Sequence, residues 1–303
     1  SDVHVHAMYG SIHKRQTGSK RQGSNFYSLF CVLLVPCLIF AVIFGLLSFG
    51  AHENAPLTTT AVSLLFLLFL VWIGFKAYSA YAFYRATPKT STSLFPVVFY
   101  LLLFFCCFFA LGSGLGFGFV NHSTNLRMYK AIVKMNAYVN VDLGVSTGPQ
   151  LMDAGRVMFK EGTYLDMSKA MSFRDHTTYC VVPIVNPNGT VAGGSYDAWA
   201  VGENCCSGPP HTFECAEYAN TAAHGARRMI EDSKRPFYRL AVQQAEATYH
   251  MRSMHPLFFH WMQDPFAEVQ EKRKAGIKTF LIGFGSFALA MLFVIMCAVF
   301  FLI

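Results

Sequence analysis

Apolar residues in this chain gather in four long blocks, whereas a globular core would scatter them at helical or strand periods. Each block exceeds the roughly 20 residues that a helix needs to cross about 30 Å of hydrocarbon. Short polar breaks separate the first three blocks, and a long segment separates the third from the fourth. The pattern therefore predicts four transmembrane helices, at residues 26–50, 58–84, 94–120 and 277–303.

The long segment before the last block is large enough for an independent core. The chain then divides into a tail at residues 1–25, three transmembrane helices with short loops at 26–120, a large domain at 121–276 and a fourth transmembrane helix at 277–303. A signal peptide is the alternative for the first block. The apolar run there is longer than the apolar part of a typical signal peptide, and no small-residue cleavage site follows it.

Composition agrees with a membrane protein. The chain is 53% hydrophobic and 14% charged, well below the charged fraction of about 25% in ordinary soluble domains. Thirty phenylalanines add weight, because lipid accepts exposed rings that water disfavours.

Basic residues near the helix ends predict the orientation. The tail at 1–25 carries four Lys or Arg against one acid, and the loop after the second helix carries Arg85 and Lys89 without an acid. Lys and Arg in short flanking loops stay cytoplasmic. Both chain ends are then cytoplasmic, and residues 121–276 are extracellular or luminal. The basic cluster at 272–278 opposes this assignment weakly, because long domains translocate largely regardless of charge.

Two glycosylation sequons fall in the segment that is placed outside. Asn188-Gly189-Thr190 lies well inside it, and we expect Asn188 to be the modified residue. Asn121-His122-Ser123 adjoins the end of the third helix. Asn121 is then too close to the membrane to receive a glycan. The protein would be a glycoprotein of the cell surface or of another membrane of the secretory pathway.

Cysteines divide by location. Five of the nine lie inside predicted helices, where a cysteine acts as a small apolar residue. The other four fall close together in the external segment, and an even set on the oxidising side predicts two disulfides. The adjacent Cys205 and Cys206 do not bond each other, which leaves Cys180 with one of them and Cys215 with the other.

The external segment contains predicted helices and one predicted hairpin. Residues 177–185 and 196–201 are rich in β-branched and aromatic residues and flank Asn186-Pro187-Asn188-Gly189, a strong turn signal. Helices are predicted at residues 126–141, 150–171, 213–233, 236–254 and 258–274. The fold class is an all-α four-helix transmembrane bundle with a large, mostly helical, disulfide-stapled α+β external domain.

Motifs for catalysis or cofactor binding are missing from the sequence. There is no nucleophile elbow, phosphate loop or dinucleotide fingerprint, so we expect no enzyme, no cofactor and no small-molecule substrate. Scattered histidines match no zinc spacing, which predicts no metal site; they are His224, His250, His255 and His260. Four acidic residues of the external segment are scattered, and we interpret them as solvated charges on the faces of helices. They are Asp153, Glu161, Asp166 and Asp175.

The predicted helices are nearly free of ionisable residues. Lys76 is the one charge well inside a block, and its long stem can reach the headgroups. The other interpretation of Lys76 is a place on an ion pathway. The net charge of +7 comes partly from the tail, which favours attraction to anionic lipid over binding of nucleic acid.

The third predicted helix holds a run of glycines at small-xxx-small spacing. Gly112 with Gly116, and Gly114 with Gly118, let another helix approach closely. Packing inside the bundle is the favoured role, and an interface with another subunit is the alternative.

The overall arrangement resembles the tetraspanins. The chain has a short outer loop, a short cytoplasmic loop, and a large external segment with the doublet Cys205-Cys206-Ser207-Gly208 before the fourth helix. In tetraspanins other cysteines pair back to such a doublet, and here Cys180 and Cys215 match those parts. The segments 179–183 and 199–206 are also similar to four-span membrane proteins of algal and alveolate protists. The resemblance implies an organiser of partners rather than a catalyst.

The leading hypothesis is thus a non-enzymatic membrane scaffold or accessory subunit, bound to membrane lipid and to other membrane proteins or copies of itself. The alternative is a transport or channel subunit whose pathway forms between subunits.

Overall fold

The computed structural model describes residues 27–50, 55–86, 94–207 and 212–302, so the basic tail at 1–25 lies outside the described residues. The chain forms two compact units. One is Ser1–Leu126 with Ala275–Ile303, called the helical unit below, and the other is Arg127–Lys274, called the sheet domain.

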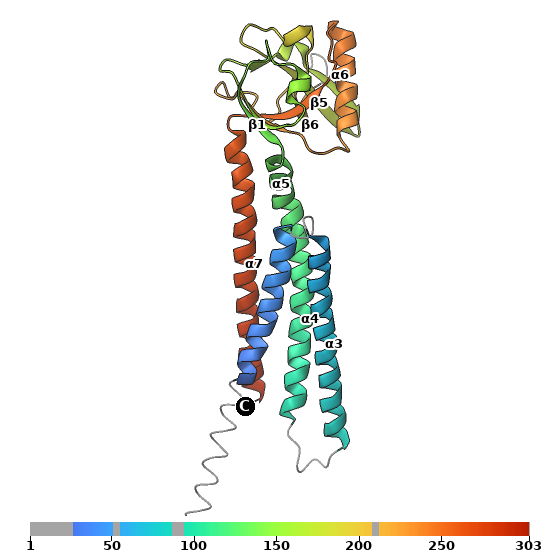
Figure 1. Ribbon diagram of the computed structural model, residues 1–303, viewed down its shortest axis with the longest axis vertical. Coiled ribbons are helices and arrows are strands. Elements are labelled where there is room, and N and C mark those ends of the chain that lie inside the picture. Colours follow the sequence, from blue (N-terminus) through green and yellow to red (C-terminus); the bar gives the residue numbers. More distant parts are fainter. Residues whose placement is uncertain (1–26, 51–54, 87–93, 208–211, 303) are drawn as a thin grey trace, which may run out of the picture. The chain divides into compact units, whose positions relative to one another are not determined.

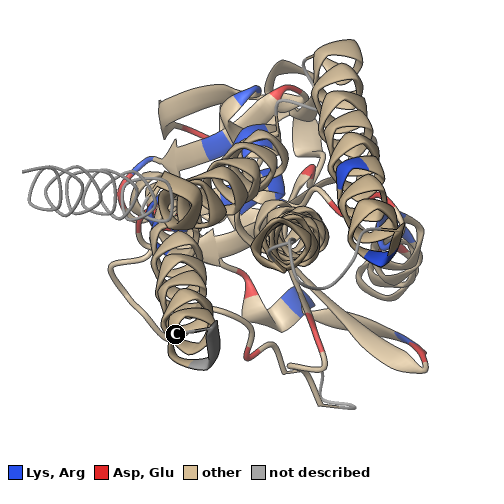
Figure 2. Cartoon of the chain, turned by 90° about the horizontal axis from the view of Figure 1, so that it is seen from below, with Lys and Arg blue, Asp and Glu red and all other residues tan. Residues whose placement is uncertain are grey.

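Among the described residues, four helices are long and apolar enough to cross a membrane, which fits an integral membrane protein and agrees with the predicted number. Their long ribbons stand out in Figure 1, and the helices seen from below in Figure 2 are mostly tan, the colour of uncharged residues. The third continues through a π-helical turn, η1 (His122–Leu126), into α5 (Arg127–Val133). The four are Tyr27–Ser48, α3 (Pro56–Ala86), α4 (Phe95–Asn121) and α7 (Pro265–Leu302).

Aromatic side chains of the first helix form the centre of the helical unit. Phe40 and Phe44 are fully buried. Phe40 stacks on Phe287 of α7 with ring centroids 4.2 Å apart, and Phe44 lies 4.9 Å from Phe280. Lipid gives helices no hydrophobic drive toward one another, so close packing of this kind holds the bundle together.

The sheet domain is built on a mixed sheet of eight strands. The order is β1-β2-β7-β8-β6-β5-β3, and β4 also pairs with β5. The pairs β1–β2 and β6–β8 are parallel, and the others are antiparallel. The strands are β1 (Asn136–Val141), β2 (Ala154–Phe159), β3 (Tyr164–Leu165), β4 (Met171–Asp175), β5 (Thr177–Val185), β6 (Ala198–Glu203), β7 (Gly225–Arg228) and β8 (Leu257–Met262).

Each face of the sheet carries its own core. Successive side chains of a strand point to opposite faces, so Cys180 and Val182 of β5 join one core while Tyr179 and Val181 join the other. Helix α6 (Arg235–Tyr249) covers the second face, as Figure 1 shows. Segments before β2 and β7 close the first core. Because β5 is buried on both faces, its sequence is a continuous apolar run rather than an alternating one.

Several predicted elements agree with the structure. Strand β5 has the predicted bounds and pairs antiparallel with β6, so the predicted hairpin is present. Helix α6 occupies most of the predicted 236–254, with Pro236 in its first turn. Helix α5 continues the third apolar helix but ends at Val133, and the rest of the helix predicted at 126–141 is wrong, because residues 136–141 form β1.

The expectation of a mostly helical domain is wrong. Residues 150–171 contain β2 and β3 joined by turns, and residues 213–233 contain turns and β7. Residues 257–262 form β8, so the helix predicted at 258–274 begins only at Pro265. Short apolar runs fit helical and strand periods equally well, and pairing with neighbouring strands decides between them. The Pro209-Pro210 break lies outside the described residues.

Candidate functional site

Two of the α4 glycines form the contact with the first helix. A Cβ atom built at Gly118 would lie 2.7 Å from Leu47 Cβ, and one at Gly114 would lie 3.4 Å from Ile43 Cβ. A side chain at Gly118 would force the two helices apart. This face of α4 therefore has the intramolecular packing role that the sequence favoured.

The other two glycines belong to a different face of α4. Nothing among the described residues lies within 4 Å of a Cβ built at Gly112 or Gly116. Both are exposed, and Leu115 beside them is also exposed. We call Gly112 and Gly116 the open glycine face. The bundle contacts of the first helix thus use Gly114 and Gly118 and leave Gly112 and Gly116 unused.

A buried polar cluster joins three of the helices at the end of α4. Asn121 is 1% exposed, and its Nδ2 donates to Ser48 Oγ at 3.1 Å and to the Gly276 carbonyl oxygen at 3.0 Å. Asn125 Nδ2 donates to Asn121 Oδ1 at 2.9 Å. His122 Nδ1 lies 3.2 Å from the Ser48 carbonyl oxygen. Sequence reasoning missed this cluster, because its partners are 73 and 155 residues away from Asn121.

The two sequons differ sharply in accessibility. Asn188 is exposed in the turn that follows β5, where its backbone N–H donates to Asn186 Oδ1. Asn121 has its amide nitrogen occupied by the two hydrogen bonds of the polar cluster. Only the first of these asparagines has a side-chain nitrogen that a modifying enzyme can reach.

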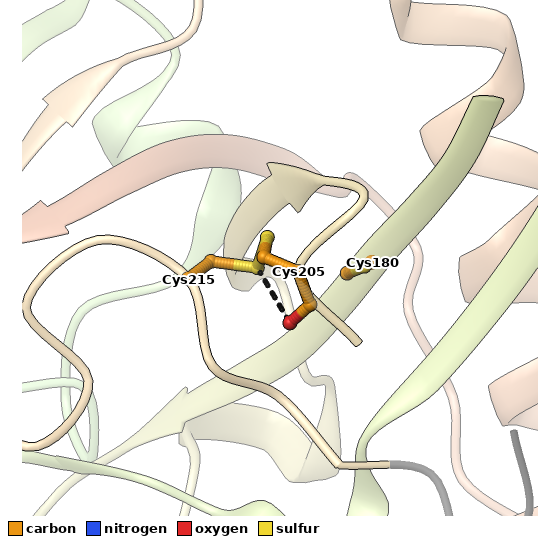
Figure 3. Close-up of side chains that lie close together, drawn as sticks. All are labelled: Cys180, Cys205 and Cys215. Carbon is orange, nitrogen blue, oxygen red and sulfur yellow. Dashed lines mark hydrogen bonds between the residues drawn. A yellow bond between two sulfur atoms is a disulfide. The ribbon is translucent and has the colours of Figure 1, made fainter. Parts of the chain in front are cut away.

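Four cysteines of the sheet domain form two disulfides side by side. Cys180 bonds Cys206, and Cys205 bonds Cys215. Figure 3 shows the second bond beside Cys180, with Cys215 Sγ 3.4 Å from the Cys205 carbonyl oxygen. Gly202 of β6 makes room for them, since a Cβ there would lie 2.5 Å from Cys215 Sγ. This is one of the two arrangements that the sequence allowed.

The sulfur atoms of this cluster have metal-ligand spacing but are not available as ligands. Those of Cys180, Cys205 and Cys215 lie within 4.8 Å of one another, yet each is used in a disulfide. A thiolate, not a disulfide, binds metal. The four histidines considered above do not join this group.

A recess of about 360 Å³ lies beside the Cys205–Cys215 bond. Lys234 forms an ion pair of 2.6 Å with Glu203, which raises the pKa of Lys234. Burial, with a smaller effect from nearby Arg227, lowers the pKa of His260 to about 4. His260 is therefore neutral at physiological pH.

The acidic residues considered above make local contacts on turns and strand ends rather than on helix faces. Asp153 accepts from Tyr138 Oη at 2.8 Å, and Asp166 pairs with Lys169. Asp175 contacts the neighbouring His176. Glu161 is exposed on the turn after β2. These acids are not gathered into one group.

Comparison of the chain with protein-family models, curated proteins and solved structures gave no match. Four apolar helices are not enough to define a tetraspanin-like protein. The tetraspanin resemblance therefore stays a prediction from the sequence.

Proposed function

We propose that the protein is a non-enzymatic membrane scaffold or accessory subunit that self-associates in the plane of the membrane through the open glycine face. In this proposal the sheet domain lies on the extracellular or luminal side and is available to partners. The proposal rests on one observation, that Gly112 and Gly116 form a small-xxx-small surface that the bundle does not use.

Helices in lipid associate where small residues allow close approach of their backbones. The Gly114 and Gly118 face illustrates this within the chain, because it brings the first helix against α4. The open glycine face has the same spacing on the same helix. A second copy can pack there in the same manner without disturbing the contacts of the first helix.

The charge content of the helices supports a scaffold over a transport pathway. The sequence of α4 contains no charged residue. In α3, Lys76 is exposed and its Nζ lies 5.7 Å from the centre of the Trp72 ring. A relay for ions normally places ionisable groups inside the bundle. The alternative, a channel formed between subunits, predicts ion flux in liposomes that falls in Lys76→Met.

Native mass spectrometry of the full chain in mild detergent tests the scaffold proposal. We expect a dimer or larger assembly for the wild type, and mostly monomer for Gly112→Leu/Gly116→Leu. Gly285→Leu is the matched control, because a Cβ at Gly285 of α7 also meets no atom within 4 Å. A wild type that is monomeric and carries no partner, or a glycine variant that assembles normally, would contradict the proposal.

A further inference from the structure

The sheet domain holds three arginines around one cleft. Arg228 ends β7, Arg235 begins α6, and Arg239 follows one helical turn later. All three line a recess of about 330 Å³. A second recess of about 430 Å³ shares Arg235 and Arg239 with it. We call the two recesses together the arginine cleft.

Two neighbouring arginines of β7 differ in the hydrogen-bond partners of their guanidinium groups. Arg227 Nε donates to Glu268 Oε2 at 2.7 Å, a normal ion pair. Arg228 Nη1 is buried and has no hydrogen-bond partner among the described residues. Its guanidinium lies 5.4 Å from the centre of the Phe259 ring. A ring face attracts a cation but is a poor substitute for an oxygen acceptor.

An unpaired buried donor is costly, and each one in a folded protein calls for an explanation. Burial, with a smaller effect from Arg235, lowers the pKa of Arg228 to about 10. The group therefore still carries its charge at neutral pH. One acid lines the cleft, Asp232, and it contacts Arg235 Nη2 at 2.9 Å. With three arginines and one acid, the cleft has a net charge of about +2.

The rest of the lining is mostly apolar, apart from His255 beside Pro256. A compact anion such as inorganic phosphate would leave this surface uncovered. A planar or aliphatic body would cover it, at about 25 cal/mol for each Å² removed from water. Met152 and Met254 are the exposed apolar residues of this lining, whereas Met229, Leu257 and Phe258 are buried beneath it.

We propose that the arginine cleft binds an amphiphilic organic anion, in which an oxyanion group meets Arg228 and Arg239 and an apolar body lies against Met152 and Met254. Guanidinium groups bind carboxylate, phosphate and sulfate oxygens through paired N–H donors. The arginine cleft shares no residue with the open glycine face. The proposal of anion binding therefore does not depend on whether the protein self-associates.

Isothermal titration of the full chain in zwitterionic nanodiscs tests this site with phenyl phosphate, inorganic phosphate and phenol. We expect phenyl phosphate to bind most tightly, inorganic phosphate weakly and phenol least. Arg228→Met and Arg239→Gln should each weaken phenyl phosphate at least about tenfold, the loss of one charge-assisted hydrogen bond. Arg174→Gln, an exposed arginine on β4, should change affinity less than about twofold.

A second measurement separates a binding role of Arg228 from a structural one. Removing a buried donor that lacks a partner should leave the Tm of Arg228→Met unchanged or raise it. A structural arginine would instead lower the Tm on removal. Failure of phenyl phosphate to bind, equal binding of phenol, or full binding by both arginine variants would overturn the proposal.

Discussion

Asn121 donates a hydrogen bond of 3.0 Å to the carbonyl oxygen of Gly276, and thereby ties the end of α4 to α7. The same amide nitrogen also reaches Ser48 of the first helix. One side chain thus joins three helices that are far apart in the sequence. Apolar packing alone allows such helices to slide along their axes. A shared hydrogen-bonded amide fixes the position of each helix along its axis relative to the other two.

Replacement of Asn121 by leucine should destabilise the helical unit. Ser48 would lose its donor and the Gly276 carbonyl would be left without this partner, so we expect a loss of roughly 1–3 kcal/mol. Thermal unfolding of the purified chain in detergent measures the effect. Ser123→Ala serves as the control, because it removes the sequon of Asn121 but leaves the polar cluster unchanged. Equal Tm values for the two variants would argue against a structural role.

Glycosylation should occur at Asn188 and not at Asn121. On expression in a eukaryotic secretory pathway, we expect peptide N-glycosidase to shift the wild type and Ser123→Ala alike, and to leave Asn188→Gln unshifted. The result would also place the sheet domain on the luminal side, since sequons are modified there. A wild type without any shift would remove this support for the proposed orientation.

The two disulfides should contribute unequally to stability. Cys180–Cys206 closes a separation of 26 residues and Cys205–Cys215 one of 10. The loop-entropy model gives roughly 3.5 kcal/mol for the first and about 2.7 kcal/mol for the second. Paired alanine variants, compared by chemical denaturation, should follow that order. Peptide mapping without reduction checks the connectivity, and a Cys180–Cys205 peptide would show that the pairing is the other arrangement.

Stability should fall as the pH drops from about 6.5 to about 4, because His260 resists protonation only in the folded state. Its folded pKa is about 4, whereas an unfolded histidine has a pKa of about 6.5. The unfolded chain therefore binds an extra proton in this window, which costs roughly 3 kcal/mol at most. Above about pH 6.5 His260 is neutral in both the folded and the unfolded chain, so this loss of stability is absent.

Thermal unfolding at pH 7.5 and pH 5 measures the effect of His260. His260→Gln should reduce the difference in Tm between the two conditions. His176→Asn is the control, because the His176 side chain is 98% exposed. The surroundings of His260 include Arg227, Glu231, Lys234 and Glu203, so a difference that persists unchanged in His260→Gln would assign the pH dependence to those groups instead.

The parts of the fold that the sequence predicted are those with strong local signals. A helix in lipid must be continuously apolar, so the four helices were visible in the pattern. Strand β5 was visible because a β-branched run ends in a marked turn. Strand β7, with the sequence Gly-Ala-Arg-Arg, carries no such signal. It is a strand because β2 and β8 pair with it on both sides.

Candidate sites were predictable to the extent that their residues are close in sequence. The four external cysteines lie within a short segment, and their pairing was narrowed to two arrangements. In the arginine cleft, Arg235 and Arg239 share a helix face at a spacing of four, which is visible in the sequence. Arg228 comes from a different element, and neither its burial nor its unpaired nitrogen can be read from the residue types around it.

The position of β8 bears on how the protein is made. Strand β8 pairs with β7 on one side and β6 on the other, and thus joins two halves of the sheet. It is also the last of the eight strands of this sheet in chain order, immediately before α7. A nascent chain that has reached residue 250 holds β1, β2 and β7 without the strand that pairs them to β6 and β5. Completion of the sheet must therefore await synthesis of β8, and until then the edges of β6 and β7 that β8 covers have no strand partner.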